Sequence, residues 1–140
     1  MGHELGQFRN RSRAKQLISF HNLKFGDCAP TDVDMIMDCK GMAWIVGELK
    51  YAGADCDYGQ RLALERFVEN SAAFGKPAYA IIADHYVDDP EEDVDAAAAI
   101  VREIKCGYGR WQPPKKQITV REALEWIEKK HNIPFRKESA

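Results

Sequence analysis

The sequence lacks the features that mark membrane, secreted and zinc-binding proteins. No apolar run approaches the roughly 18–20 residues that a membrane-spanning helix needs, and the N-terminus has no apolar signal segment. No C-x-x-C pair occurs, and no histidine stands at zinc-finger spacing from a cysteine. We therefore expect a cytoplasmic protein that has no membrane partner and no disulfide bond. The cysteines are then buried or incidental thiols: Cys28, Cys39, Cys56 and Cys106.

A strong positive charge is also missing, since the net charge is −2. A nucleic-acid partner would have to be bound by a local basic surface rather than by bulk charge. One basic run near the N-terminus is either a solvated charged segment or an arm that contacts phosphates. It consists of Arg9, Arg11, Arg13 and Lys15. The preceding residues 1–10 carry little pattern and are a candidate for disorder.

What is present is an ordinary globular composition. The chain has 140 residues, of which 45% are hydrophobic and 30% charged, and it contains no internal repeat. This length favours a single domain, residues 1–140, with a modest core. The order of the expected elements, described next, predicts an α/β fold with a central mixed β-sheet flanked by α-helices.

The segment 31–51 reads as two apolar strands joined by a tight turn around residues 39–41. We place Asp34 opposite Glu48, which sets Met35 opposite Gly47 and Met37 opposite Ile45. Alternation then puts the acids of both strands on one face, together with Lys50. A slip of one residue would separate the two acids. Asp32 shares the parity of Asp34 and is either an acid that supports the site or a loop cap.

The remaining elements follow from helical periodicity and apolar runs. A helix is expected from residue 60 to about 70–74, ending at Gly75, and the apolar run 78–83 predicts a buried parallel strand. Residues 94–105 predict a second helix, after an acidic segment, 84–95, that is a solvated loop, a second metal site or a DNA mimic. A capping box at Thr119 begins a last helix, which ends near His131.

The hairpin carries chemistry that a structural strand does not need. Two carboxylates on adjacent strands, from Asp34 and Glu48, form a hard oxygen-donor site that suits Mg²⁺ or Mn²⁺, and the Leu49 carbonyl can complete it. Lys50 would lie beside the attacking water, where it could orient that water, stabilise developing charge or help remove a proton. This set suits metal-assisted hydrolysis of a phosphodiester. The other interpretation is a structural cluster of salt bridges.

Asp34, thirteen intervening residues and then Glu48-Leu49-Lys50 make a pattern that resembles the PD-(D/E)XK nuclease superfamily. Gln60 adds to the resemblance, because members of the RecB-like branch carry a glutamine on the helix that follows the second strand. The chain looks closest to small phage or prophage members. It departs from them where Pro30 is not followed by an acid, where Leu64 replaces a tyrosine, and in having only Glu4 as a candidate for the N-terminal glutamate.

The resemblance implies a restriction-endonuclease-like core and a Mg²⁺- or Mn²⁺-dependent nuclease that acts on DNA. Asp34, Glu48 and the Leu49 carbonyl would bind the metal, Lys50 would act on the attacking water, and Gln60 would assist. Arg61 is then a phosphate contact or a surface charge, and Tyr51 stacks on a base or lines the edge of the core. We also expect a homodimer. The alternatives are a nuclease-like module that binds DNA or protein without cutting, such as a phage-encoded inhibitor of host defence, and an RNA-directed nuclease.

Overall fold

The computed structural model describes residues 18–135. The chain divides into two compact units at residues 30 and 31, and each is described by itself. The described part of the first unit, residues 18–30, contains a short 3₁₀ helix, η1 (His21–Leu23), and an isolated bridge between Phe25 and Cys28. The basic run at residues 9–15 and Glu4 lie outside the described residues.

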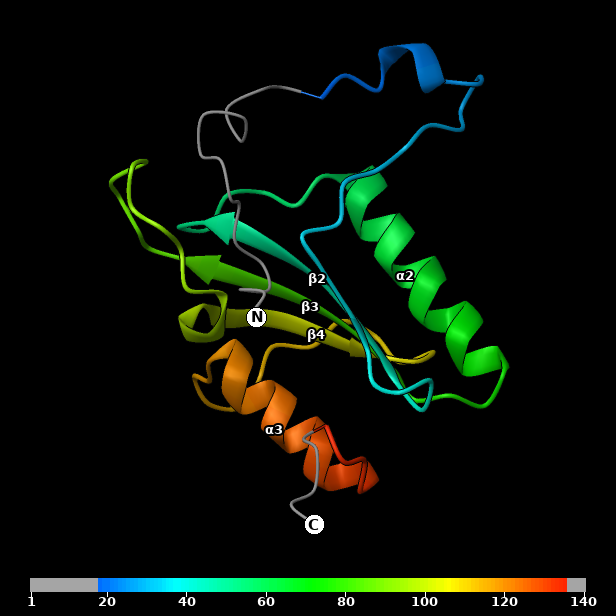
Figure 1. Ribbon diagram of the computed structural model, residues 1–140, viewed down its shortest axis with the longest axis vertical. Coiled ribbons are helices and arrows are strands. Elements are labelled where there is room, and N and C mark those ends of the chain that lie inside the picture. The colour runs from blue at the N-terminus through cyan, green and yellow to red at the C-terminus, as the bar shows by residue number, and fades with distance from the viewer. Residues whose placement is uncertain (1–17, 136–140) are drawn as a thin grey trace, which may run out of the picture. The chain divides into compact units, whose positions relative to one another are not determined.

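The second unit is an α/β structure built on one four-stranded mixed sheet, in the order β1-β2-β3-β4. Figure 1 labels β2, β3 and β4 of this sheet and the helices α2 and α3. The strands are β1 (Met35–Asp38), β2 (Trp44–Tyr51), β3 (Ala78–His85) and β4 (Ile100–Cys106). The pair β2 and β3 is parallel, whereas β1 with β2 and β3 with β4 are antiparallel. The expected α/β fold with a central mixed sheet is therefore confirmed.

The two helices, α2 (Tyr58–Ala73) and α3 (Val120–His131), pack on opposite faces of the sheet. Leu64 and Val68 of α2 pack with Val46, Ala80 and Ile82. On the other face, Val120, Ala123 and Ile127 of α3 pack with Ile45, Tyr79 and Ile81. Alternate residues of β2 and β3 thus divide between two cores, which is what the twofold periodicity of a strand requires. β3 is buried on both faces, as expected of a parallel strand under a helical crossover.

The predicted hairpin register is confirmed. Met35 lies opposite Gly47, Ile36 opposite Val46 and Met37 opposite Ile45. The connecting turn places Lys40 (φ 57°) and Gly41 (φ 71°) in the left-handed region. The Gly41 amide donates a hydrogen bond to Asp38 Oδ1 at 2.7 Å, which stabilises this turn.

The helix ends follow the expected capping chemistry. Asp57 caps α2 by accepting from the amides of Gly59 and Gln60, so the helix begins two residues before the predicted start. At α3 the capping box between Thr119 and Glu122 is present, and Asn132 ends the helix in the left-handed conformation.

The helix predicted over residues 94–105 is wrong. A short 3₁₀ helix, η2 (Ala96–Ala98), precedes β4, which pairs with β3 along its length. The four alanines at 96–99 favour a helix locally, but the β-branched residues that follow complete the sheet beside β3, and Val101 joins the α3-side core. Burial against a sheet edge that would otherwise stay unpaired outweighs the helical propensity of a short alanine run.

None of the helices within residues 18–135 is long and apolar enough to cross a membrane. Cys28, Cys39, Cys56 and Cys106 are free thiols, and Cys39 is buried in the core between the sheet and α3.

Candidate active site

Glu48 and Lys50 lie in the C-terminal half of β2, on the face that α2 covers. Val46 packs against α2, so the strand's alternation directs Glu48 and Lys50 toward the same side. The next strand, β3, runs parallel, with Asp84 opposite Lys50. In open α/β sheets, the carboxyl ends of parallel strands are where ligands bind. The parallel strands β2 and β3 therefore bring several polar groups to their C-terminal ends, a position that suits a functional site.

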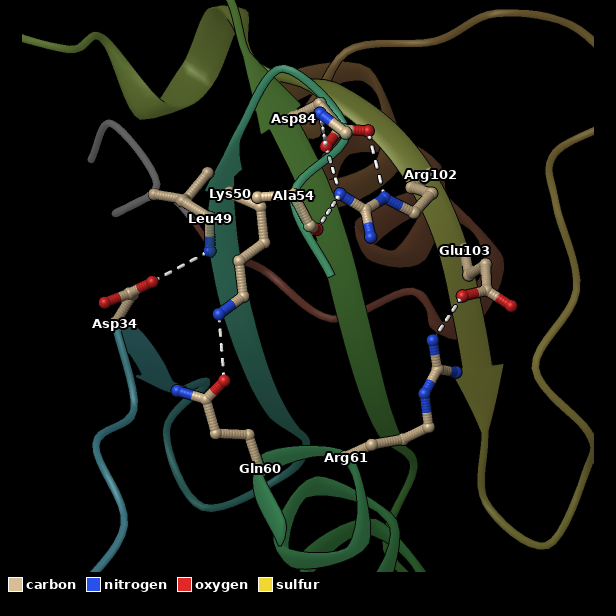
Figure 2. A network of polar contacts seen from close by, with 10 residues as sticks. Asp34, Leu49, Lys50, Ala54, Gln60, Arg61, Asp84, Arg102 and Glu103 are labelled. Atoms are coloured by element: carbon tan, nitrogen blue, oxygen red, sulfur yellow. Dashed lines mark hydrogen bonds and ion pairs between the residues drawn. The ribbon is translucent and has the colours of Figure 1, made fainter. Parts of the chain in front are cut away.

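Lys50 and Gln60 are in direct contact. The Lys50 amino group donates a hydrogen bond to Gln60 Oε1 at 2.8 Å (Figure 2). Gln60 lies in the first turn of α2, and its own amide is held by the Asp57 cap. One of the three N–H donors of Lys50 is thus committed, and two remain for a ligand.

Asp34 reaches the same strand from the other side of the hairpin. It precedes β1, and its Oδ2 accepts a hydrogen bond from the Leu49 amide at 2.8 Å (Figure 2). The pairing of Met35 with Gly47 extends naturally to Asp34 opposite Glu48. Asp34 is exposed, so solvent and ligands can reach this side of the site.

Glu48 is the least satisfied polar group of the site. Its residue surface is 3% exposed, and its Oε1 has no hydrogen-bond partner among the described residues. The pKa of Glu48 is raised to about 7, mostly by burial and also by a side-chain hydrogen bond with Asp34 and the negative charge of Asp34, while the positive charge of Lys50 lowers it. A buried carboxyl group beside a second carboxyl group is stabilised by a proton or by a bound cation.

These residues fit a hard divalent cation. The unpartnered Glu48 Oε1 is an oxygen donor without a function in the fold, and Asp34 supplies a second carboxylate beside it. Residues 18–135 contain no cluster of three His, Cys, Asp or Glu side chains arranged to hold a metal. Two carboxylates are sufficient for Mg²⁺, which commonly takes one or two from the protein and keeps several waters. The Leu49 carbonyl is the third donor expected from the sequence.

The sequence did not indicate the ion pair between Asp84 and Arg102, which lies beside Lys50 in the sheet. Arg102 donates from Nε to Asp84 Oδ2 at 3.1 Å and from Nη2 to Asp84 Oδ1 (Figure 2). The guanidinium lowers the pKa of Asp84, and Asp84 raises that of Arg102. Asp84 is an acid at the end of a buried strand, and this position is a sequence signal for a functional residue. A helix over residues 94–105 does not place Arg102 beside it, so the partner could not be predicted.

Arg61 is engaged by the protein itself. Its Nη2 lies 2.7 Å from Glu103 Oε2, and its guanidinium carbon lies 4.9 Å from the centre of the Trp111 ring. Trp111 in turn donates to Glu65 at 2.8 Å. The charge of Arg61 is therefore balanced within the fold, which favours the surface-charge interpretation over a phosphate contact.

Tyr51 does not join the other candidates. Strand alternation directs it to the opposite face from Lys50, where its ring meets His85 edge to face at 5.6 Å. Its hydroxyl donates to Asp88 Oδ1. The acidic segment that contains Asp88 forms a loop with a turn between β3 and η2, in which Asp95 caps η2. This arrangement agrees with the solvated-loop interpretation for the residues after β3, whereas Asp84 is buried at the end of β3.

Comparison of the chain with protein-family models, with curated proteins and with solved structures finds no match.

Proposed function

We propose that the protein is a divalent-metal-dependent nuclease that hydrolyses phosphodiester bonds of DNA. The observation that carries the proposal is the buried carboxyl group of Glu48, whose Oε1 has no hydrogen-bond partner among the described residues. Asp34 lies next to it, and Lys50 is two residues further along the same strand. A fold gains nothing from leaving such a group unsatisfied, because an unpaired buried acceptor costs about 1–3 kcal/mol. A ligand that supplies positive charge offsets this cost.

We further propose that the sheet and its two helices are a restriction-endonuclease-like core of the PD-(D/E)XK type. An antiparallel hairpin followed by a helical crossover to a parallel strand supports this assignment, as do the positions of Asp34, Glu48 and Lys50 at the end of the hairpin. Gln60 on the crossover helix, bonded to Lys50, also supports it.

In this proposal Asp34, Glu48 and the Leu49 carbonyl hold Mg²⁺ or Mn²⁺. The cation, when bound, lowers the pKa of a coordinated water and offsets charge on a phosphate oxygen. Hydrolysis forms a bond from the water oxygen to phosphorus and breaks the bond to the leaving oxygen.

The side chain of Lys50 acts on the same reaction. Gln60 accepts one hydrogen bond from its amino group, which leaves two N–H donors for the reaction. They orient the attacking water and stabilise the negative charge that develops on the phosphate oxygens. Asp34, hydrogen-bonded to the Leu49 amide, is fixed relative to β2 before the substrate arrives.

The test is a cleavage assay on linear duplex, nicked duplex and single-stranded DNA, with a matched RNA, over a titration of Mg²⁺ and Mn²⁺. Cleavage of DNA by the wild type, lost with chelator and lost in Glu48→Gln, supports the proposal. Gln keeps the shape of the side chain but removes the charge that a cation needs. Preferential cleavage of the RNA would reassign the substrate.

Absence of cleavage with any substrate and either metal would contradict the enzyme proposal. Binding of DNA or of a protein without cleavage would then favour the nuclease-like binding module. The acidic loop after β3 favours the protein-binding form of this module, because acidic side chains oppose the approach of a polyanion such as DNA. Sedimentation of the wild type tests the expected homodimer.

A further inference from the structure

The loop between β2 and α2, residues 52–57, joins the two sides of the Lys50–Gln60 contact. Lys50 lies just before the loop and Gln60 just after it. The loop begins with two residues in the left-handed region, Ala52 (φ 40°) and Gly53 (φ 85°). An alanine adopts such a conformation only where the surroundings hold it.

The ion pair of Asp84 and Arg102 holds this loop from the neighbouring strands. The Gly53 amide donates to Asp84 Oδ1 at 3.1 Å, and Arg102 Nη2 donates to the Ala54 carbonyl at 2.8 Å (Figure 2). The Ala52 amide adds a backbone bond to the His85 carbonyl at 2.8 Å. Three successive loop residues are thus tied to the end of β3 and to one guanidinium on β4.

A β-bulge in β4 directs the guanidinium group of Arg102 toward the loop at residues 52–57. Glu103 lies opposite Ile82 and Val101 lies opposite Ala83, so Arg102 is an extra residue without a partner on β3. Bulges redirect side chains and often occur near active sites. Here the extra residue brings a fork of donors to both Asp84 and Ala54, which a single ammonium group does not match.

We propose that the Asp84–Arg102 pair is a positioning device that sets the distance between Lys50 and Gln60 by clamping the loop between them. The inference rests on the proposed nuclease function for its catalytic consequence. Among the described residues, no hydrogen bond or ion pair joins Asp84 or Arg102 to Lys50 or Gln60, and both side chains act through the loop backbone. Misplacing a catalytic group by about 1 Å costs about 100-fold in rate. Glu48 lies on β2 and Asp34 is bonded to the Leu49 amide, both outside this loop.

The experiment compares Arg102→Ala and Arg102→Lys with Glu103→Gln in the full chain. Glu103→Gln is the matched control, since it breaks a neighbouring ion pair of β4 that makes no contact with the loop. Three quantities are measured: kcat and KM for DNA, the Mn²⁺ concentration at half-maximal activity, and hydrogen–deuterium exchange of residues 51–57.

The expected result for Arg102→Ala is a fall in kcat of about 10- to 100-fold, with KM and the Mn²⁺ midpoint unchanged within about twofold. Exchange in the loop should quicken while β2 and α2 stay protected. Arg102→Lys should recover part of kcat, and Glu103→Gln should keep it. If Arg102→Ala does not fold, Arg102→Lys provides the same test with a smaller expected loss.

Wild-type kcat in folded Arg102 variants would overturn the positioning role, as would equal losses in Glu103→Gln. Unchanged loop exchange would overturn the clamp itself, whatever the activity. A wild type that cuts no nucleic acid contradicts the proposed function instead, and loop exchange then still decides whether Arg102 clamps the loop.

Discussion

Asp34 Oδ2 accepts a hydrogen bond from the Leu49 amide, so the residue that precedes β1 is fixed against the middle of the Glu48-Leu49-Lys50 sequence. Asn at position 34 keeps an oxygen acceptor for this bond but removes the charge. We expect Asp34→Asn to fold as the wild type does and to lose most of the rise in melting temperature that Mn²⁺ produces, because bound ligands stabilise the folded state by mass action. The measurement is thermal unfolding with and without Mn²⁺.

The control for this variant is Asp38→Asn, at the other end of β1. Its Oδ1 also accepts a backbone hydrogen bond, from Gly41, and Asn retains it. Asp38→Asn should keep the full Mn²⁺ effect. A full Mn²⁺ effect in Asp34→Asn as well would remove Asp34 from the metal site.

Removal of the Lys50 amino group should abolish cleavage while leaving the fold largely intact. The expected loss for Lys50→Ala is at least about 10²- to 10³-fold in kcat, because removal of one donor that stabilises transition-state charge has an effect of this size in other enzymes. Lys40→Ala, in the turn at the opposite end of β2, is the matched control and should cut at the wild-type rate. Full activity of Lys50→Ala would exclude the lysine from the reaction.

The contact between Lys50 and Gln60 should tune the rate in a graded way. Gln60→Leu removes the acceptor and frees the lysine, so we expect kcat to fall about tenfold, the effect of losing a hydrogen bond to a charged group worth about 1.5 kcal/mol. Gln60→Glu retains an acceptor and should lose less. Steady-state kinetics of the two variants provide the measurement, and equal losses would argue that the glutamine contacts the substrate rather than the lysine.

The carboxyl group of Glu48 should make stability depend on pH. Its pKa in the folded chain is about 7, above the value of 4.5 expected when unfolded. Below about pH 4.5 the Glu48 carboxyl group is protonated in both the folded and the unfolded state. Between about pH 4.5 and pH 7 the folded chain keeps this proton while the unfolded chain releases it, so the free energy of unfolding falls as pH rises. Glu48→Gln has no such proton, and its advantage over the wild type should grow from pH 5 to pH 8.

The difference between the two proteins is the quantity to measure, by urea unfolding without metal. Burial lowers the pKa of His131, so its contribution rises with pH and opposes that of Glu48, but it is common to both proteins. Added Mg²⁺ at pH 8 should narrow the difference, because the cation replaces the proton. A difference that does not change with pH would mean that Glu48 is ionised throughout.

The capping box of α3 offers a test of the fold that does not involve the site. Thr119→Ala removes the hydroxyl that accepts from the Glu122 amide, and we expect a loss of about 1 kcal/mol in the free energy of unfolding. Cleavage per folded molecule should stay unchanged, since α3 packs on the face opposite Lys50. Equilibrium unfolding and a cleavage assay below the transition give both quantities.

The sequence predicted the parts of the fold that short patterns determine. The register of β1 with β2 followed from alternation about a tight turn, the C-terminal end of α2 followed from Gly75, and the start of α3 followed from its capping box. The family resemblance indicated Gln60 as a residue that assists at the site, but the hydrogen bond between Lys50 and Gln60 was not predicted.

The missing parts depend on contacts distant in sequence. Residues 100–106 form a strand because they can pair with the edge of β3. The preceding four alanines favour a helix locally and do not indicate that such an edge is present. The bulge at Arg102 shifts the alternation by one residue, so no period-two pattern could place its side chain beside Asp84. The raised pKa of Glu48 depends on burial under α2, which a local pattern also does not contain.

A crystal soaked in Mn²⁺ and measured for anomalous scattering tests the central claim most directly. We predict a peak between the carboxylates of Asp34 and Glu48, about 2.0–2.2 Å from Glu48 Oε1, at a Mn²⁺ concentration that supports cleavage. No peak at these carboxylates under those conditions, or a Glu48 Oε1 that remains unpartnered, would contradict the account.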